Sequence, residues 1–311
     1  MYEEFYGFVQ SPFTLAPDPR FLYLSESHEE ATRQILTSLR RREAFIVLTG
    51  DIGTGKTTLC RALMEQLDAT TFTSMILNPF ISVEELLREI LLDFVVVSRD
   101  AVRTGRVASA TKHELASALR DFLTSLVPLH GSGVLIIDEA QHLSPDVLEQ
   151  IRILSNLETN ETRLLQVVLV GQLNLLEVLA AANMRQLDQR ISLRAVLRPL
   201  SKDESSAYIA HRLSVARGSS SVSFDTGAVE RIHAVTGGVP RVINLLCDRA
   251  LMLGAQAGLS VITPDLVKQA AEGLSVTSQA ASVRSQIPGW TLVVIAILLA
   301  MVVALLITTR I

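Results

Sequence analysis

The amino-acid sequence predicts an α/β fold: a parallel sheet sandwiched by helices, then a small all-helical domain and a C-terminal transmembrane helix. Two apolar runs, residues 45–48 and 134–137, are followed by a glycine-rich loop and by two carboxylates, respectively. A continuous Val/Ile/Leu run is typical of a strand buried on both faces of a parallel sheet. After Pro199 the pattern changes to helix-like segments without strands between them, which predicts the second domain.

The glycine-rich loop is the most specific motif in the chain. Residues 50–57 match GxxxxGK[ST] between a strand-like run and a helix-like stretch, the context that this phosphate-binding loop needs. Glycines let successive backbone N–H groups point at an anion, and the following helix adds its own unpaired N–H groups. The residues expected to bind a nucleoside triphosphate here are Gly50, Asp51, Ile52, Gly53, Thr54, Gly55, Lys56, Thr57 and Thr58.

Two carboxylates at the end of the second apolar run predict hydrolysis as well as binding. Asp138, together with the Thr57 hydroxyl, is expected to hold Mg²⁺. Glu139, one residue further on, is expected to act as general base toward an attacking water. The alternative is a strand followed by a solvated acidic turn, which the pairing with the phosphate-binding loop disfavours.

Composition excludes several other classes of protein. The chain has 311 residues and a net charge of −4, which argues against bulk nucleic-acid binding, so nucleic acid is not expected as a partner. The two cysteines, Cys60 and Cys247, lie far apart without metal-ligand spacing, which predicts buried thiols and no structural zinc. Residues 98–112 carry four basic side chains and predict an exposed loop, with a site for an anionic partner as the alternative.

The expected domains are a nucleotide-binding domain over 1–200 with an irregular aromatic lead-in, a helical lid over 201–274 and a linker over 275–288. We expect strands near residues 45–48, 74–78, 134–137, 164–170 and 195–197. We expect helices near 28–42, 58–63, from 83, 113–126 and 145–157. The lid helices are expected at 203–217, 225–235, 240–257 and 264–273.

A long apolar segment closes the chain and predicts a transmembrane helix over 289–309. Its strongly apolar part, residues 290–309, would extend roughly 30 Å as a helix, the hydrocarbon thickness of a bilayer. Trp290 lies at one end, and Arg284 and Arg310 flank the run. A buried core helix is the alternative. For a transmembrane helix, the nucleotide site must face the cytoplasm, where ATP is supplied.

Four strings of sequence resemble the general secretion pathway protein A family, and the plan of α/β core plus helical lid resembles that of AAA+ ATPases. The strings are residues 13–25, 137–143, 169–172 and 237–251, and the resemblance covers about residues 1–275. It implies ATP and Mg²⁺ as cofactors and an ATPase of the bacterial inner membrane. It also implies a role in secretin assembly for type II secretion, or in related exopolysaccharide or exosortase export systems.

The resemblance also implies roles for three further residues. Gln172 resembles the sensor 1 residue that contacts the γ-phosphate or the lytic water, with a polar strand end as the alternative. Arg190 resembles the arginine finger that reaches a neighbouring subunit's γ-phosphate; Arg185 and Arg194 are rivals, and a surface salt bridge is the alternative. Arg241 resembles the sensor 2 arginine of the lid, with a surface charge as the alternative. A finger acting in trans predicts a homo-oligomer, for example a hexameric ring, alongside other export components.

Two other functions stay open from the sequence. AAA+ regulators of transposition share much of this core and act on DNA, and the basic residues at 98–112 leave that function possible. A nucleotide-gated scaffold with little turnover is the other, although the intact Asp138–Glu139 pair argues against it. The family's periplasmic peptidoglycan-binding region has no counterpart before Ile311, so we expect contact with the cell wall to need a partner.

Overall fold

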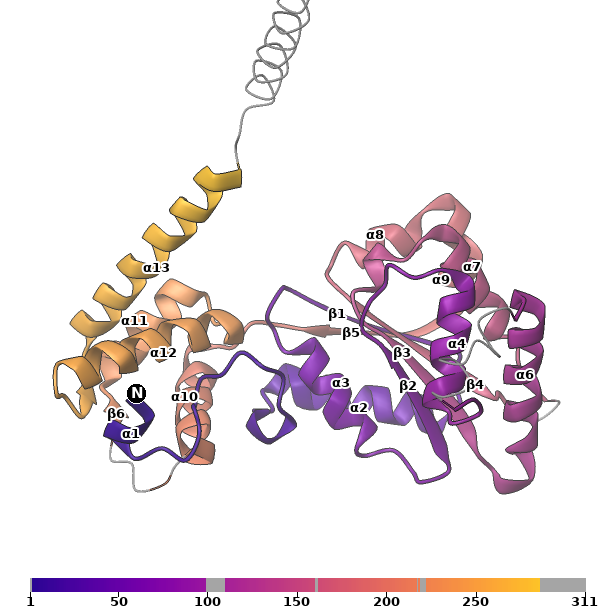
Figure 1. The fold of residues 1–311 in the computed structure, drawn as a ribbon, viewed down its shortest axis with the longest axis horizontal. Helices are drawn as coiled ribbons and strands as arrows, with labels where there is room; N and C mark the ends of the chain where they lie inside the picture. Colours follow the sequence, from indigo (N-terminus) through magenta and orange to yellow (C-terminus); the bar gives the residue numbers. More distant parts are fainter. Residues whose placement is uncertain (1, 99–109, 160–161, 217, 219–221, 286–311) are drawn as a thin grey trace, which may run out of the picture.

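A computed structural model describes residues 2–98, 110–159, 162–216, 218 and 222–285. Figure 1 shows an α/β part that contains the large sheet and, beside it, a group of helices that forms the lid. The N-terminal residues lie with the lid and not with the sheet. The two parts predicted from the sequence are therefore present, but the chain is divided between them differently.

The large sheet has five parallel strands in the order β2-β3-β4-β1-β5. The strands are β1 (Phe45–Gly50), β2 (Thr71–Ile76), β3 (Ser132–Ile137), β4 (Leu165–Gly171) and β5 (Ile191–Leu197). Every residue of β1, β3 and β4 is buried, as their continuous apolar runs predict. Because the strands are parallel, their C-terminal ends meet at one edge, and this edge receives the glycine-rich loop, Asp138 and Gln172.

Helices cover both faces of the sheet. They are α2 (Glu26–Arg40), α3 (Lys56–Met64), α4 (Val83–Asp93), α6 (Lys112–Ser125), α7 (Pro145–Leu154), α8 (Leu175–Ala180) and α9 (Arg185–Asp188). Side chains of β1 alternate between the faces: Ile46 and Leu48 pack in the cluster with α2 and α3, whereas Phe45 and Val47 pack in the cluster with α4, α6 and α7. Capping boxes at Ser82 and Thr111 begin α4 and α6.

Strand β5 is longer than predicted. It begins at Ile191, whereas the sequence indicated a strand only from Ala195. As an edge strand it alternates buried and exposed side chains, so it lacks the continuous apolar run of the central strands. Residues 99–109 of the predicted basic loop lie outside the described residues, and Lys112 is the first residue of α6.

The lid consists mainly of four helices, but the prediction that it is all-helical is wrong. Its helices are α10 (Lys202–Ala216), α11 (Thr226–Thr236), α12 (Pro240–Gln256) and α13 (Pro264–Ser285). Two short strands, β6 (Ser223–Phe224) and β7 (Val261–Ile262), form a parallel pair within it. Two residues are too few to give a periodic signal. The predicted linker over 275–288 is also corrected in part, because α13 continues to Ser285.

The aromatic side chains of the lead-in pack on the lid, although the segment also contacts α3, where Arg61 donates to the Pro17 carbonyl at 3.2 Å. It contains α1 (Tyr2–Tyr6) and a single 3₁₀ turn, η1 (Pro19–Phe21). Its aromatic side chains share one core with α10, α12 and α13. The Tyr2 hydroxyl donates to Asp248 at 2.5 Å and the Tyr6 hydroxyl donates to the Leu259 carbonyl at 2.9 Å. Most aromatic residues of the lead-in thus belong to the core of the lid.

The inner-membrane location predicted from the sequence is contradicted. Within the described ranges, which end at residue 285, no helix combines the length and apolar character needed to cross a bilayer. The expected span over 289–309 lies outside those ranges.

Candidate functional site at the junction of sheet, lead-in and lid

The glycine-rich loop joins β1 to α3 and surrounds the ammonium group of Lys56. Gly53 and Gly55 have φ of 83° and 99°, the left-handed region that glycine adopts without strain. The buried Lys56 Nζ donates to the carbonyls of Gly50 and Asp51, each at 2.9 Å. Burial lowers the pKa of Lys56, while the carboxylates of Glu139 and Asp138 oppose this shift. The loop therefore presents a cation where a bound phosphate would be neutralised.

Thr57 and Asp138 meet at the adjoining strand end. The Thr57 hydroxyl donates to Asp138 Oδ2 at 2.5 Å, and Asp138 is buried directly after β3. A hydroxyl and a carboxylate oxygen side by side are the hard oxygen ligands that Mg²⁺ prefers. The donor set therefore fits the ion predicted from the sequence. Bound there, Mg²⁺ would neutralise charge on the nucleotide phosphates.

Glu139 is held in an unusual backbone conformation beside the same loop. Its φ and ψ are 51° and 36°, the left-handed region that non-glycine residues rarely adopt and that is often found at functional sites. Its carboxylate accepts hydrogen bonds from Gln141 at 2.6 Å and from Gln172 at 3.4 Å. The structure thus brings the predicted Glu139 and Gln172 together.

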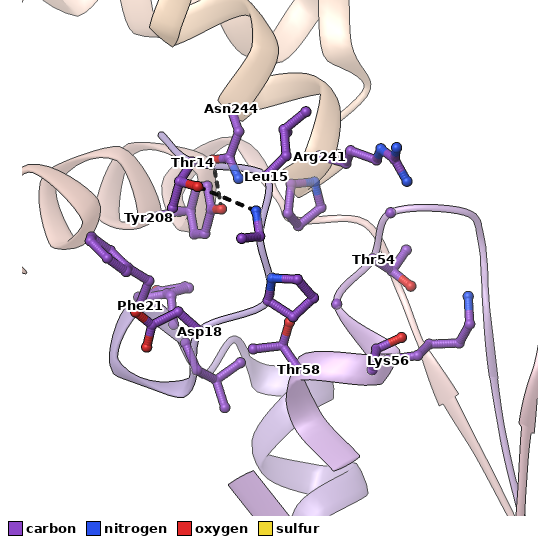
Figure 2. A pocket seen from close by; sticks show the side chains of 18 of the residues that line it. Thr14, Leu15, Asp18, Phe21, Thr54, Lys56, Thr58, Tyr208, Arg241 and Asn244 are labelled. Carbon is purple, nitrogen blue, oxygen red and sulfur yellow. Dashed lines mark hydrogen bonds between the residues drawn. The ribbon is translucent and has the colours of Figure 1, made fainter. Parts of the chain in front are cut away.

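A cavity of ≈ 200 Å³ extends from this loop between the lead-in and the lid (Figure 2). Its phosphate end is lined by residues 52–58 and by Glu139. Gly50 and Asp51 lie behind that lining, where their carbonyls hold Lys56. The opposite end, which we call the base end, is lined by residues 14–18 and 21–23 of the lead-in together with Tyr208, Arg212 and Asn244 of the lid.

The base end contains residues that the sequence analysis did not identify. The buried Arg212 donates to the carbonyls of Pro12 at 2.6 Å and Thr14 at 2.9 Å, and its guanidinium lies 4.3 Å from the centre of the Phe21 ring. Tyr208 donates its hydroxyl to Asn244 at 2.8 Å. Arg212 therefore holds the lead-in against the lid. Its only signal in the sequence is a charged residue within a helix, which has no specificity by itself.

His28 contacts the glycine-rich loop and lines the same cavity, and it was also missed. Its Nε2 lies 3.0 Å from the Thr54 carbonyl, which can only accept, so Nε2 carries the proton. Its Nδ1 then accepts from the Ser25 hydroxyl at 2.6 Å. The ring is buried, and burial lowers the pKa of His28, which keeps the imidazole neutral. Ser25 also caps α2, so this helix and the loop are tied through one side chain.

The predicted sensor 2 residue lies where the lid meets the loop. Arg241, at the start of α12, donates its backbone N–H to the Gly53 carbonyl at 3.2 Å and lines the cavity. A Cβ on Gly53 would lie 2.5 Å from the Arg241 Cβ, so glycine is required for this approach. The lid helix therefore contacts the loop directly.

The candidate arginine finger lies at the N-terminal ends of the strands, whereas the glycine-rich loop of its own chain lies at their C-terminal ends. Arg190 precedes β5, whose first residue pairs with Phe45, whereas Gly50 pairs with the last. The intervening length of β1 separates Arg190 from the loop by roughly 17 Å. Arg190 donates to the Asn156 side chain. Of its rivals, Arg194 pairs with Asp188 at 2.7 Å and Arg185 is exposed. Arg190 is therefore not part of its own chain's site.

Comparisons with known proteins agree with this geometry. A family model described as an AAA domain matches residues 39–179. General secretion pathway protein A of Aeromonas hydrophila is 42% identical to this chain over 259 residues, 83% of the chain. The chain is an AAA protein related to general secretion pathway protein A. The resemblance found in the sequence is thereby confirmed, and an AAA domain of this kind implies nucleotide binding and hydrolysis. The chain spans 46% of the length of that relative.

Solved structures of similar fold have much lower sequence identity. The ORC2 protein of Aeropyrum pernix has a TM-score of 0.66 at 16% identity and covers 85% of this chain and 72% of its own. Cdc6p of Pyrobaculum aerophilum has a TM-score of 0.63 at 19% identity, with coverage of 86% and 71%. The RuvB Holliday junction branch migration motor of Thermotoga maritima has a TM-score of 0.55 at 18% identity, covering 82% and 70%. At these identities the likeness shows the fold alone.

Proposed function

We propose that this chain is a Mg²⁺-dependent ATPase that works as a homo-oligomer in the assembly or operation of an envelope secretion or export system. The hydrolytic part of the proposal rests on the cluster of side chains at the C-terminal ends of the strands. Thr57 and Asp138 are in contact, and Glu139, hydrogen-bonded to Gln172, lines the cavity that Lys56 also lines. These are the parts that bind a triphosphate and orient a water for attack on it.

The oligomeric part of the proposal rests on Arg190. Arg190 precedes β5 at the end of the sheet away from the loop of its own chain, and its guanidinium contacts Asn156. A γ-phosphate within its reach would therefore be one bound by a neighbouring subunit. An arginine suits this role because it stays charged and offers a planar pair of donors. Arg241, which lines the cavity from α12, would link the nucleotide state to the position of the lid.

The secretion part of the proposal rests on the identity to general secretion pathway protein A. Secretin assembly is the form of it that the family resemblance favours. It predicts that a strain lacking this chain loses secretin multimers, that the wild-type chain restores them and that Glu139→Gln does not. Restoration by Glu139→Gln would show that turnover is not needed and would favour a nucleotide-gated scaffold.

The hydrolytic and oligomeric parts are tested together by steady-state ATPase activity of the full chain against protein concentration. We expect the specific activity to rise with concentration. Glu139→Gln should lose about 10²–10⁴-fold in kcat, the usual contribution of a general base, while retaining nucleotide binding. Arg190→Ala should lose activity with nucleotide binding retained, and Arg194→Ala, four residues further on in β5, is its control. Activity that is flat with concentration and insensitive to Arg190→Ala would overturn the role of a finger in trans.

A further inference from the structure

We propose that Gln141 is a positioning residue that holds the Glu139 carboxylate in the orientation needed for hydrolysis; this inference rests on the proposed ATPase function. Gln141 follows Glu139 by two residues, in the short 3₁₀ turn η3 (Ala140–His142) after β3. Its side chain is buried, with 8% exposed. Its Nε2 donates to Glu139 Oε2 at 2.6 Å, a shorter contact than the one from Gln172 to the same oxygen.

The orientation of the Gln141 amide is fixed by its other end. Gln141 Oε1 accepts the backbone N–H of Gln172 at 3.2 Å. A backbone N–H can only donate, so the oxygen of the amide must face β4 and the nitrogen must face Glu139. The reverse orientation would bring two oxygens together at Glu139 and two donors together at Gln172. Gln141 therefore joins the end of β3 to the end of β4 through a polarised bridge.

The bridge uses one carboxylate oxygen of Glu139 and leaves the other available. Both Gln141 and Gln172 donate to Oε2, and in the part of the chain that the structure describes no donor to Oε1 is found. Glu139 lines the nucleotide cavity. An anchored Oε2 and an available Oε1 are what a base needs to accept a proton from a water in a fixed position. Gln172 can turn toward a γ-phosphate while Gln141 keeps its hold on Glu139.

The space for Gln141 depends on Gly171. A Cβ at position 171 would lie 2.5 Å from Gln141 Oε1, closer than real Cβ contacts allow. Gly171 is the last residue of β4, so the close approach of the amide to this strand end requires a residue without a side chain. Gly171→Ala replaces no polar side chain of the site but should displace the Gln141 amide, which gives a second variant; the new methyl group would also lie 3.0 Å from Leu175 Cδ2.

The test compares the full chain with Gln141→Leu, Gln141→Glu and Gly171→Ala, and uses Gln66→Leu on the exposed surface as control. Gln141→Glu retains an acceptor for the Gln172 N–H but cannot donate to Glu139. We expect both Gln141 variants to lose about 10–100-fold in kcat, because a small misplacement of a reacting group costs up to 10²-fold. Binding of a fluorescent ATP analogue should stay within about twofold of wild type, since the phosphate-binding loop is unchanged. The kcat of Gly171→Ala should also fall.

A double-mutant cycle with Glu139→Gln separates positioning from general damage. If Gln141 acts through Glu139, adding Gln141→Leu to Glu139→Gln should lower kcat no further. Three results would each overturn the inference: additive losses in the cycle, an unchanged kcat in the Gln141 variants, or a parallel loss of nucleotide binding. The proposed ATPase function would still stand in each case, because the wild-type chain turns over ATP. Absence of turnover by the wild-type chain under oligomer-forming conditions would overturn the proposed function and the inference with it.

Discussion

The phosphate end and the base end of the nucleotide cavity are built in opposite ways. The phosphate end comes from residues 52–58 and from Glu139, which follow strands β1 and β3 of the same sheet. The base end comes from residues 14–23 and from Tyr208, Arg212 and Asn244, which are about two hundred positions apart in the chain. The first is a local motif with a fixed geometry. The second exists only after the lead-in has docked on the lid.

Different forces hold the two ends. At the phosphate end a buried ammonium lies among backbone carbonyls and carboxylates, and hydrogen bonds set the geometry. At the base end aromatic packing and one buried guanidinium do so. Substitutions at the base end should therefore reduce stability and affinity together, whereas substitutions at the strand ends should reduce turnover. The three predictions below test this contrast, from the largest expected effect to the smallest.

Arg212→Leu should damage the base end most. The change leaves the Pro12 and Thr14 carbonyls without their buried donor, and each unsatisfied group costs about 1–3 kcal/mol, so we expect a loss of about 2–4 kcal/mol in the free energy of unfolding. Urea denaturation measures it. Nucleotide affinity should fall as well, because the lead-in lines the cavity. Arg231→Leu, on the exposed side of α11, is the control and should change stability little. Equal stability of the two variants would show that Arg212 does not hold the lead-in.

Gly53→Ala tests the contact between the glycine-rich loop and the lid helix α12. The new methyl group would collide with Arg241 at 2.5 Å and also carry the strain of φ 83°. We expect nucleotide affinity to fall about tenfold, equivalent to about 1.4 kcal/mol, measured by titration with a fluorescent ATP analogue. Gly237→Ala is the matched control, because Gly237 also has a positive φ but a methyl group there would meet nothing within 4 Å. Similar losses in both variants would mean that backbone strain, not contact with α12, is responsible.

His28 should make the phosphate end weakly sensitive to acid. Burial holds the pKa of His28 below the value of about 6.5 that the unfolded chain has, so in acid the unfolded state binds more protons. The free energy of unfolding should therefore fall as pH drops through about 6.5. His28→Asn should flatten this fall by at most about 1.4 kcal/mol per pH unit, the limit for one proton. Burial also lowers the pKa of His211. His211 is present in both the wild type and the variant, so its effect on the pH dependence cancels when the two are compared. An unchanged slope would show that His28 is already protonated in the folded state, whereas the exposed control His113→Asn should have no effect.

The phosphate end could be predicted from the sequence much better than the base end. The strands β1, β3 and β4 were predictable because burial on both faces forces a continuous apolar run, and the loop because phosphate binding forces glycine, lysine and threonine at fixed spacing. Glu139 and Gln172 were predicted as separate residues, and the structure joins them through Gln141. Gln141 was missed because a glutamine two residues after a carboxylate has no signature of its own.

The base end could not be predicted for a physical reason. Docking of the lead-in depends on contacts between distant segments, such as Tyr2 with Asp248, and no periodicity within either segment records them. His28 was missed on the same grounds, since its partner Thr54 lies 26 positions away. The roles of Arg190 and Arg241 came from family resemblance and remain predictions.

The lead-in is translated before the lid helices that cover it. Tyr2, Tyr6 and Phe8 pack against α12 and α13, which are translated at the other end of the described chain. Because domains fold during synthesis roughly in the order in which they emerge, the sheet can complete its own two cores while the lead-in is still uncovered. For that interval the nascent chain exposes the aromatic side chains of the lead-in, which the lid later covers.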